Sequence, residues 1–308
     1  MDEKKEFIFR RWNREETFTE ICRKFGISAK TGCKRLARFK EQGAAGLAEL
    51  SRTPKNNANK VAESVKKRLL KLKGKHKYWG AYKILTLYAG KYPGEHAPAR
   101  SAVEALFKKE GYTGRKKRTR KRGEDRLQAR VEAKEPNDVW TVDFKGWWRT
   151  ARGEKCLPLT VRDEHSKYIL AIEILEKGDT AHAKAVFEPL FRAYGLPRFI
   201  RSDNGPPFGN VFNLRGLSRL SVWFMSLGIK TDLDDPGCPY QNGGHERMHR
   251  DMKKELQGKI RGNLSDHQKA FDRWRKAFNE VRPHEGLGMK RPKRCIRNPG
   301  VCGRAWIF

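Results

Sequence analysis

Hydrophobic positions at helical spacing mark a small unit over residues 7–40. Gly26 lies at a bend and Ser28 is placed to cap a second helix. This layout predicts a helix-turn-helix, with an ordinary helical hairpin as the alternative. Three side chains are expected to hold the second helix down: Cys33, Leu36 and Phe39. Gly32 within that helix costs about 1 kcal/mol relative to alanine. The side chains expected to face the DNA major groove are Ala29, Lys30, Thr31, Lys34 and Arg35.

A second helical unit is expected over residues 61–112. Its first helix, about 61–73, has apolar positions at helical spacing, and a later helix opens at Pro98 and Ser101. We interpret it as a second helix-turn-helix, so that the pair could follow a DNA site longer than one turn. The polar stretch before it contains Arg52, which could enter a minor groove or lie in a solvated loop. The basic run GRKKRTRKRGEDR after it is expected to be both a linker and a phosphate-binding strap.

From about residue 137 the pattern changes to alternating strands and helices. NDVWTVDFKGWW, CLPLTVRDEHS and KYILAIEIL predict three successive strands in an antiparallel meander. An amphipathic helix, the strand RFIRSDNG, a helix at about 211–227, the strand IKTDLDDP and a helix at 243–258 follow. This order is typical of a ribonuclease-H-like domain. A last helix, DHQKAFDRWRKAFNEV, leads into RPHEGLG.

The predicted fold class is therefore an α/β ribonuclease-H-like catalytic core preceded by two all-α helix-turn-helix units. The expected boundaries are 1–45 for the first unit, 46–60 for a linker, 61–112 for the second unit, 113–130 for a basic linker, 131–262 for the catalytic core, 263–292 for the C-terminal helix with its RPHEGL segment, and 293–308 for an atypical tail.

Positive charge is concentrated in the first part of the chain. Of a formal net charge of +32, residues 1–130 contribute +22, from 36 Lys and Arg against 14 Asp and Glu. A balance this basic implies a polyanionic partner, most simply nucleic acid held through its phosphates. The alternatives are a membrane surface or plain solubility, and neither requires charge concentrated in one half.

Cysteine usage and hydropathy predict a cytoplasmic protein. The six cysteines form no C-x-x-C pair, which favours reduced thiols and no cysteine-built zinc site. No run of about 18 apolar residues is present, so no membrane partner is expected. The N-terminus is charged from its second residue and lacks the apolar segment of a secretory signal.

Three carboxylates are candidates for a metal site. Asp143 ends the first predicted strand of the α/β part and Asp203 ends the fourth, and these strands are expected to be neighbours. Glu246 begins a helix that can pack against that edge of the sheet. Hard oxygen ligands are what Mg²⁺ requires, and two such ions can hold the attacking and leaving oxygens of a phosphoryl displacement. We therefore expect two Mg²⁺ ions at Asp143, Asp203 and Glu246, with Mn²⁺ as a substitute.

The same helix contains HERMH, residues 245–249, which matches the H-E-x-x-H zinc pattern. Met248, Met252, Leu256 and Ile260 are expected to form its buried stripe. A separate polar face is expected from Glu246, His249, Arg250 and Lys253, with His245 off that face. A zinc metalloprotease is the remote alternative, and Glu280 on the next helix could supply its third ligand. A short pattern with two free positions recurs by chance, and a protease has no use for the basic N-terminal half.

Other acidic residues are expected to have structural roles. Asp163 and Glu164 follow the second strand and are expected to shape a turn. Asp232, Asp234 and Asp235 are expected in an exposed loop, because Pro236 and Gly237 follow them directly.

Several stretches together resemble one family. They are NDVWTVDFKGWW, LPLTVRDEHSKY, YGLPRFIRSDNGPPFG, DDPGCPYQNGGHERMHRDMKKEL and NEVRPHEGLG. In this order they look like bacterial insertion-sequence DDE transposases with a retroviral-integrase-type catalytic core. The resemblance covers about residues 15–292. It implies that Asp143, Asp203 and Glu246 are the acidic triad, and that Arg250 and Lys253, one and two turns past Glu246, hold the DNA end. HERMH is then the local context of the triad glutamate.

The resemblance implies a DNA transposase, a polynucleotidyl transferase that binds the terminal inverted repeats of its element through residues 1–112. Metal-dependent hydrolysis at the element end would be followed by strand transfer into target DNA. The expected partners are double-stranded DNA, as element ends and target, and further copies of the chain in a dimer or higher oligomer. The expected location is the bacterial cytoplasm, in association with the nucleoid. The alternative in another class is a non-catalytic, sequence-specific DNA-binding regulator, such as a decayed transposase.

The last residues depart from the family pattern. After Arg291 and Pro292 the chain runs KRCIRNPGVCGRAWIF, which fits neither a helical period nor a strand alternation. We expect that a frameshift or deletion ended the reading frame after about residue 294 and removed a C-terminal part. The catalytic core would still fold, because all its expected elements precede this point.

Overall fold

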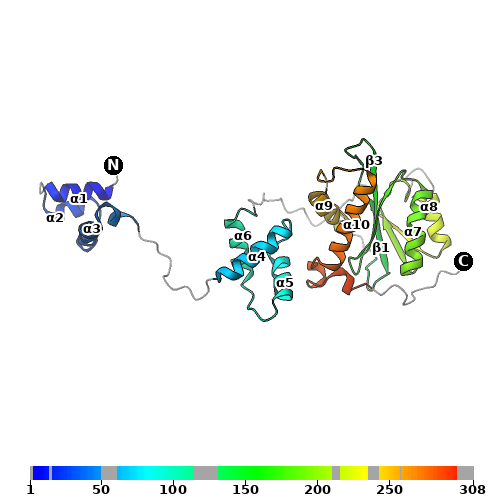
Figure 1. The fold of residues 1–308 in the computed structure, drawn as a ribbon, viewed down its shortest axis with the longest axis horizontal. Helices are drawn as coiled ribbons and strands as arrows, with labels where there is room; N and C mark the ends of the chain where they lie inside the picture. Colours follow the sequence, from blue (N-terminus) through cyan, green and yellow to red (C-terminus); the bar gives the residue numbers. More distant parts are fainter. Residues whose placement is uncertain are drawn as a thin grey trace. The chain divides into compact units, whose positions relative to one another are not determined.

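The computed structural model describes residues 3–13, 16–49, 61–113, 131–209, 216–234, 243–256 and 258–296. The chain divides into two compact units, Met1–Lys60 and Val61–Phe308, and Figure 1 labels their helices and strands. Arg52, most of both expected linkers and the tail from residue 297 lie outside the described residues. Within the described ranges, no helix combines the length and apolar character needed to cross a membrane.

The regular elements of the first unit, within its described residues, are all helices. It contains α1 (Glu3–Asn13), α2 (Phe18–Lys24), α3 (Ala29–Gln42) and the short η1 (Gly43–Leu47). Thr17 and Glu20 form a capping box at the start of α2. Ser28 caps α3 by accepting a hydrogen bond from the backbone N–H of Thr31, which confirms the predicted helix start. Gly26 joins the two helices with φ of +60°, a conformation that glycine adopts without steric cost.

The packing of α3 differs from the prediction at two neighbouring positions. Leu36 and Phe39 do pack against the core of the unit, but Cys33 is exposed, so its expected packing role is wrong. Gly32 is buried instead. A Cβ atom at Gly32 would lie 2.8 Å from Cys22 Sγ and 2.9 Å from Phe18 Cζ. The cost of a glycine inside the helix is therefore accepted because only glycine allows α3 this close to α2.

The second unit begins with a three-helix cluster, formed by α4 (Glu63–Lys75), α5 (Ala81–Lys91) and α6 (Arg100–Lys109). Its core contains Leu69, Ile84, Tyr88 and Phe107, each with at most 1% of its surface exposed. The buried amine of Lys73 donates to the carbonyl oxygens of residues 77 and 79, at 2.8 Å and 2.7 Å. These bonds tie the end of α4 to the turn before α5 and satisfy the buried charge.

A mixed sheet follows. Its strands are β1 (Val139–Phe144), β2 (Trp148–Arg149), β3 (Lys155–Asp163), β4 (Ile169–Leu175), β5 (Phe199–Ser202) and β6 (Lys230–Leu233). β3 pairs antiparallel with β1, β2 and β4, whereas β5 pairs parallel with both β1 and β6. The predicted antiparallel meander and the predicted neighbours β1 and β5 are confirmed. The expected ribonuclease-H-like fold class is confirmed with them.

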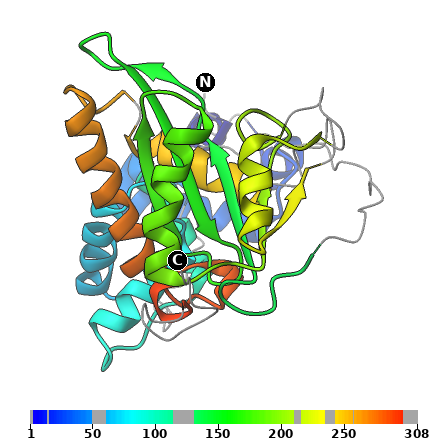
Figure 2. The ribbon, with the colours of Figure 1, turned by 90° about the vertical axis from the view of Figure 1, so that its right-hand side faces the viewer.

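Helices cover both faces of this sheet. α7 (Thr180–Tyr194) and α8 (Arg219–Ser226) pack on one face, and α9 (Gly243–Leu256) and α10 (Leu264–Glu280) on the other. Figure 2 views the sheet from the side of α7. As described, α8 begins eight residues later than the start expected at about 211, because Ser218 caps it in a capping box with Ser221.

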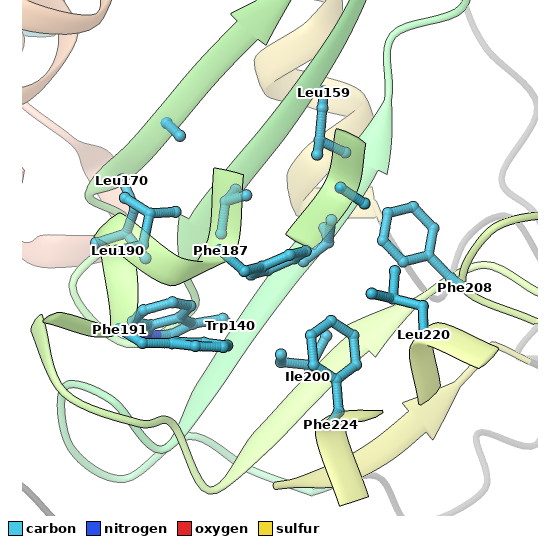
Figure 3. Close-up of a cluster of buried hydrophobic side chains, with 14 of the residues drawn as sticks. Trp140, Leu159, Leu170, Phe187, Leu190, Phe191, Ile200, Phe208, Leu220 and Phe224 are labelled. Carbon is cyan, nitrogen blue, oxygen red and sulfur yellow. The ribbon is translucent and has the colours of Figure 1, made fainter. Parts of the chain in front are cut away.

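Strand alternation assigns each face its own core. Trp140 and Val142 of β1 point toward α7, where Trp140 stacks on Phe191 with ring centroids 5.6 Å apart (Figure 3). On the opposite face, Met248 and Met252 of α9 are each 2% exposed, which confirms the predicted stripe at these positions. Each fully buried side chain of this size contributes about 1.5–3 kcal/mol. Because successive side chains of a strand point to opposite faces, the residues of β1 that alternate with Trp140 face α9.

The close approach at Gly32 gives a test of the first unit. Gly32→Val should lower the free energy of local opening of α1–α3 by about 1–3 kcal/mol, because the added side chain enters a filled space. Native-state hydrogen exchange on the full chain measures this directly. Ala37→Val, at an exposed position of the same helix, is the matched control and should change protection by no more than about 0.5 kcal/mol. Equal effects of the two substitutions would contradict the packing role of Gly32.

Candidate active site at the ends of β1 and β5

Two of the predicted carboxylates lie at adjoining strand ends. Asp143 is the last but one residue of β1 and Asp203 directly follows β5, the parallel neighbour of β1. Burial, together with the nearby carboxylates of Asp203 and Asp234, raises the pKa of Asp143 to about 7. Burial also raises the pKa of Asp203. The structure thus brings Asp143 and Asp203 together in a partly buried site that disfavours negative charge.

Asp234 belongs to this site, contrary to the expectation of an exposed loop. It follows β6 and is only 7% exposed, and its backbone N–H donates to the carbonyl of Ser202 at 2.9 Å. Asn204 donates its side-chain amide to the Asp234 carbonyl. Asp232 is not free in a loop either, because it accepts a 2.7 Å ion-pair hydrogen bond from Arg201. Parallel pairing of β6 with β5 carries both acids to the sheet edge, whereas Asp235 lies outside the described residues.

Glu246 lies in the first turn of α9 and is exposed. Among the described residues, no three His, Cys, Asp or Glu groups lie close enough together to hold one metal ion. Asp143 and Asp203 nevertheless offer the donor chemistry that Mg²⁺ prefers, since both are carboxylates at one edge of the sheet, and burial together with neighbouring carboxylates raises the pKa of Asp143. These two residues suit a divalent cation, but the described structure does not bring a third carboxylate close enough to them to complete the site.

Both histidines of HERMH are buried, so the expectation that His249 lies on the polar face is wrong. His245 is 0% exposed and His249 is 6% exposed. The Nε2 atoms of both rings lie within hydrogen-bond distance of one hydroxyl, Thr160 Oγ1, at 2.6 Å and 2.7 Å. His245 Nδ1 lies 3.0 Å from the Thr141 hydroxyl. Three of the four imidazole nitrogens therefore lie at hydroxyl groups of the sheet, and no metal-binding group of three side chains is found among the described residues.

The Thr160 hydroxyl fixes the protonation of these rings. It has one hydrogen and two lone pairs, and its third neighbour is the carbonyl oxygen of Asp143 at 2.8 Å. A carbonyl only accepts, so Thr160 donates to Asp143 and both Nε2 atoms donate to Thr160. The neutral form of both rings follows from their pKa, which burial and neighbouring cationic groups lower, to about 3 for His249. His249 Nδ1, which carries a lone pair in this form of the ring, lies 3.5 Å from Asp143 Oδ2.

Basic side chains flank the acids. Lys145 lies near Asp143 and Lys253, and its pKa is lowered by burial and by the neighbouring Lys253. Arg250 and Lys253 are exposed on α9, as expected for residues of its polar face. On α3, Lys30, Thr31 and Lys34 are exposed, whereas Arg35 is half-buried. Lys145 was not predicted as part of the site, although it lies only two residues after Asp143 in the sequence.

Sequence comparison identifies the second half of the chain. Two family models described as integrase core domain match residues 133–239 and 227–292. An uncharacterized 39.2 kDa protein of insertion element IS476 from Xanthomonas euvesicatoria is 27% identical over 84% of this chain and 72% of its own length. The Gag-Pol polyprotein of baboon endogenous virus (strain M7) is 34% identical over 41% of this chain, a match that spans only 7% of the polyprotein.

Among solved structures, the HTLV-2 integrase catalytic core domain in complex with magnesium aligns with 54% of this chain and 100% of its own, with a TM-score of 0.41 and 18% identity. The two family matches assign residues 133–292 to the integrase core class. The chain belongs to the bacterial insertion-sequence transposases with a retroviral-integrase-type core, as the resemblance predicted. Family membership places it in the DNA-integration class.

The raised pKa of Asp143 predicts a pH-dependent stability without metal. Between pH 3.8 and about 7 the folded state keeps a proton that the unfolded state has released, so stability falls as pH rises through this window. The full difference corresponds to at most about 4 kcal/mol. Asp143→Asn should remove this dependence and be the more stable protein at pH 8, as measured by thermal denaturation in a chelator. Asp272→Asn, at a half-exposed surface carboxylate, is the control. A variant Asp143→Asn that is no more stable than wild type at pH 8 would contradict the assignment.

Proposed function

We propose that the chain is a DNA transposase that hydrolyses the ends of its element and transfers them to target DNA. One observation carries this proposal: two carboxylates at adjoining strand ends of an integrase-family core share a site in which the pKa of Asp143 is raised to about 7. A bound cation would offset the unfavourable negative charge of these buried carboxylates. The proposed partners are double-stranded DNA and at least one further copy of the chain, because two element ends must be joined.

Asp143, Asp203 and Glu246 are the proposed ligands of Mg²⁺, or of Mn²⁺ in its place, with two ions in the active complex. The chemistry that bound Mg²⁺ supplies in sites of this kind is activation of the attacking oxygen and neutralisation of charge on the phosphoryl group. Glu246 lies in the first turn of α9. The buried side of this helix, at His245 and His249, is hydrogen-bonded to β3 through Thr160. This anchorage fixes the position of the helix that carries Glu246.

The remaining residues of the proposed site are cations that would position the DNA. Arg250 and Lys253 follow Glu246 at helical spacing, so their cationic groups can hold phosphates that neighbour the reacting one. Lys145 adds a cation next to Asp143. The residues of the chain act by orientation and charge, because phosphoryl transfer of this kind needs no covalent protein intermediate.

The acidic triad can be tested by single substitutions. Asp143→Asn, Asp203→Asn and Glu246→Gln should each lower Mg²⁺-dependent cleavage of labelled element-end DNA to background, while leaving binding of that DNA within about threefold of wild type. Asp234→Asn is the matched control, since Asp234 is the other carboxylate that acts on Asp143. An active Glu246→Gln together with an inactive Asp234→Asn would replace Glu246 by Asp234 as the third ligand. Cleavage by all four variants would contradict the assignment of these carboxylates, and absence of cleavage by the wild type would favour the non-catalytic regulator.

The DNA-reading role proposed for α3 predicts a loss of preference. Lys30→Gln and Lys34→Gln should each reduce the preference for element-end DNA over random DNA by about 1–3 kcal/mol, if each side chain contacts a base edge. Fluorescence anisotropy at fixed salt with both duplexes measures this ratio. Lys40→Gln, exposed in the last turn of the same helix, should leave the ratio unchanged. A wild-type chain without any preference would overturn the sequence-reading role.

A further inference from the structure

A basic cleft lies beside the N-terminal end of α9. It has a volume of about 660 Å³ and is lined by residues of α5 and the turn before it, of β3 and the loop after it, of α9, and of the end of α10 with the segment that follows. The cationic side chains in its wall are Lys83, Arg162, Lys167, Arg247, Arg250 and Arg282. The acidic side chains there are Asp251, which pairs with Arg282, and Glu285, which is 3.9 Å from Lys83. The lining is therefore positive after its internal ion pairs are counted.

Two arginines in this wall are buried and incompletely bonded. The Arg162 side chain is 3% exposed and pairs with Glu164, yet its Nε–H has no hydrogen-bond acceptor among the described residues. The Arg282 side chain is 7% exposed and pairs with Asp251, yet its Nε–H and Nη1–H have no hydrogen-bond acceptor there either. Its Nη1 lies 3.9 Å from Glu255, too far for a hydrogen bond. A buried charged donor without an acceptor costs more than a neutral one, and both arginines line the cleft, so an acceptor bound beside them would be favourable.

The start of α9 adds to the same positive region. A Cβ atom at Gly244 would lie 2.5 Å from Arg162 Nη2, so the guanidinium group lies directly against the first turn of the helix. The first turn of a helix has free N–H groups and the positive end of the helix dipole. A cation placed there is unfavourable, and Glu164, which pairs with Arg162, offsets part of this cost. Phosphate oxygens satisfy both features, because they accept bonds from guanidinium and from backbone N–H groups.

We propose that this cleft binds a backbone phosphate of DNA. The choice of DNA as the source rests on the proposed function and on the surroundings of the cleft, which is far larger than one phosphate and is bordered by the exposed Arg247 and Arg250 of α9. Arg250 is one helical turn beyond Glu246. A strand whose phosphate lies between Arg162 and Arg282 can therefore continue along α9 toward Asp143 and Asp203.

Salt-dependent binding tests the cleft without any cleavage. The affinity of the full chain for a labelled duplex is measured over a series of KCl concentrations in a chelator, for wild type, Arg247→Gln and Lys254→Gln. Both substituted residues are exposed on α9 and each change removes one positive charge, but Lys254 does not line the cleft. Arg247→Gln should reduce the slope of log K against log salt by about 0.9, the value for one lost phosphate contact. Lys254→Gln should leave the slope unchanged.

A second arm identifies the source of the phosphate. Thermal denaturation of the wild type and of Arg247→Gln is compared in inorganic phosphate and in chloride at equal ionic strength. An unchanged slope with stabilisation of the wild type alone by phosphate means that the cleft takes a free anion, which overturns the DNA assignment. Equal slope changes in both variants, or no effect in either arm, overturn the site. Failure of the proposed function appears instead as absent cleavage by the wild type and leaves the slope comparison intact.

Discussion

The position of β1 in the middle of the sheet determines the rest of the site. Antiparallel pairing with β3 places Asp143 opposite Thr160, and parallel pairing with β5 brings the end of β5, and so Asp203, to the same edge. Because side chains alternate along a strand, the residues that face α9 are the polar Thr141 and Asp143, while their neighbours Trp140 and Val142 fill the core against α7. A shift of one residue would exchange these sets, so the apolar core and the acidic site stabilise the same register.

The contact between β3 and α9 is polar where most helix-sheet contacts are apolar. One threonine hydroxyl satisfies two imidazoles and a backbone carbonyl, and each partner has the donor or acceptor that the others require. Methionines can slide over a sheet with little change in energy, but this hydrogen-bonded set has one arrangement. It therefore fixes the rotation of α9 about its axis. That rotation decides which way Glu246, Arg250 and Lys253 point relative to Asp143.

The sequence predicted the strands, their order and the acids at the strand ends, because period-two alternation and turn residues are local signals. It did not predict that His249 is buried. A polar residue at the boundary of a helical stripe looks exposed from the sequence, because its partner, Thr160, is 89 positions away. Asp234 was misplaced for a similar reason: the following Pro-Gly suggested exposure, but the pairing of β6 with β5 carries it inward. At Gly32 and Cys33 the helical period was right, and the close approach of α2 to α3 determined which of the two residues is buried.

The cations of the chain fall into two physical classes. Exposed groups such as Lys30, Lys34 and Lys253 act through solvent, where salt screens them beyond about 8 Å, so such groups attract a polyanion diffusely and hold it loosely. Arg162 and Arg282 are buried and are oriented by Glu164 and Asp251, and Arg282 also stacks over Phe278. A guanidinium held in this way cannot follow a moving phosphate, so it selects one position for it. If both classes bind the same strand, the exposed lysines determine how readily it arrives, and the buried arginines determine which phosphate reaches Asp143 and Asp203.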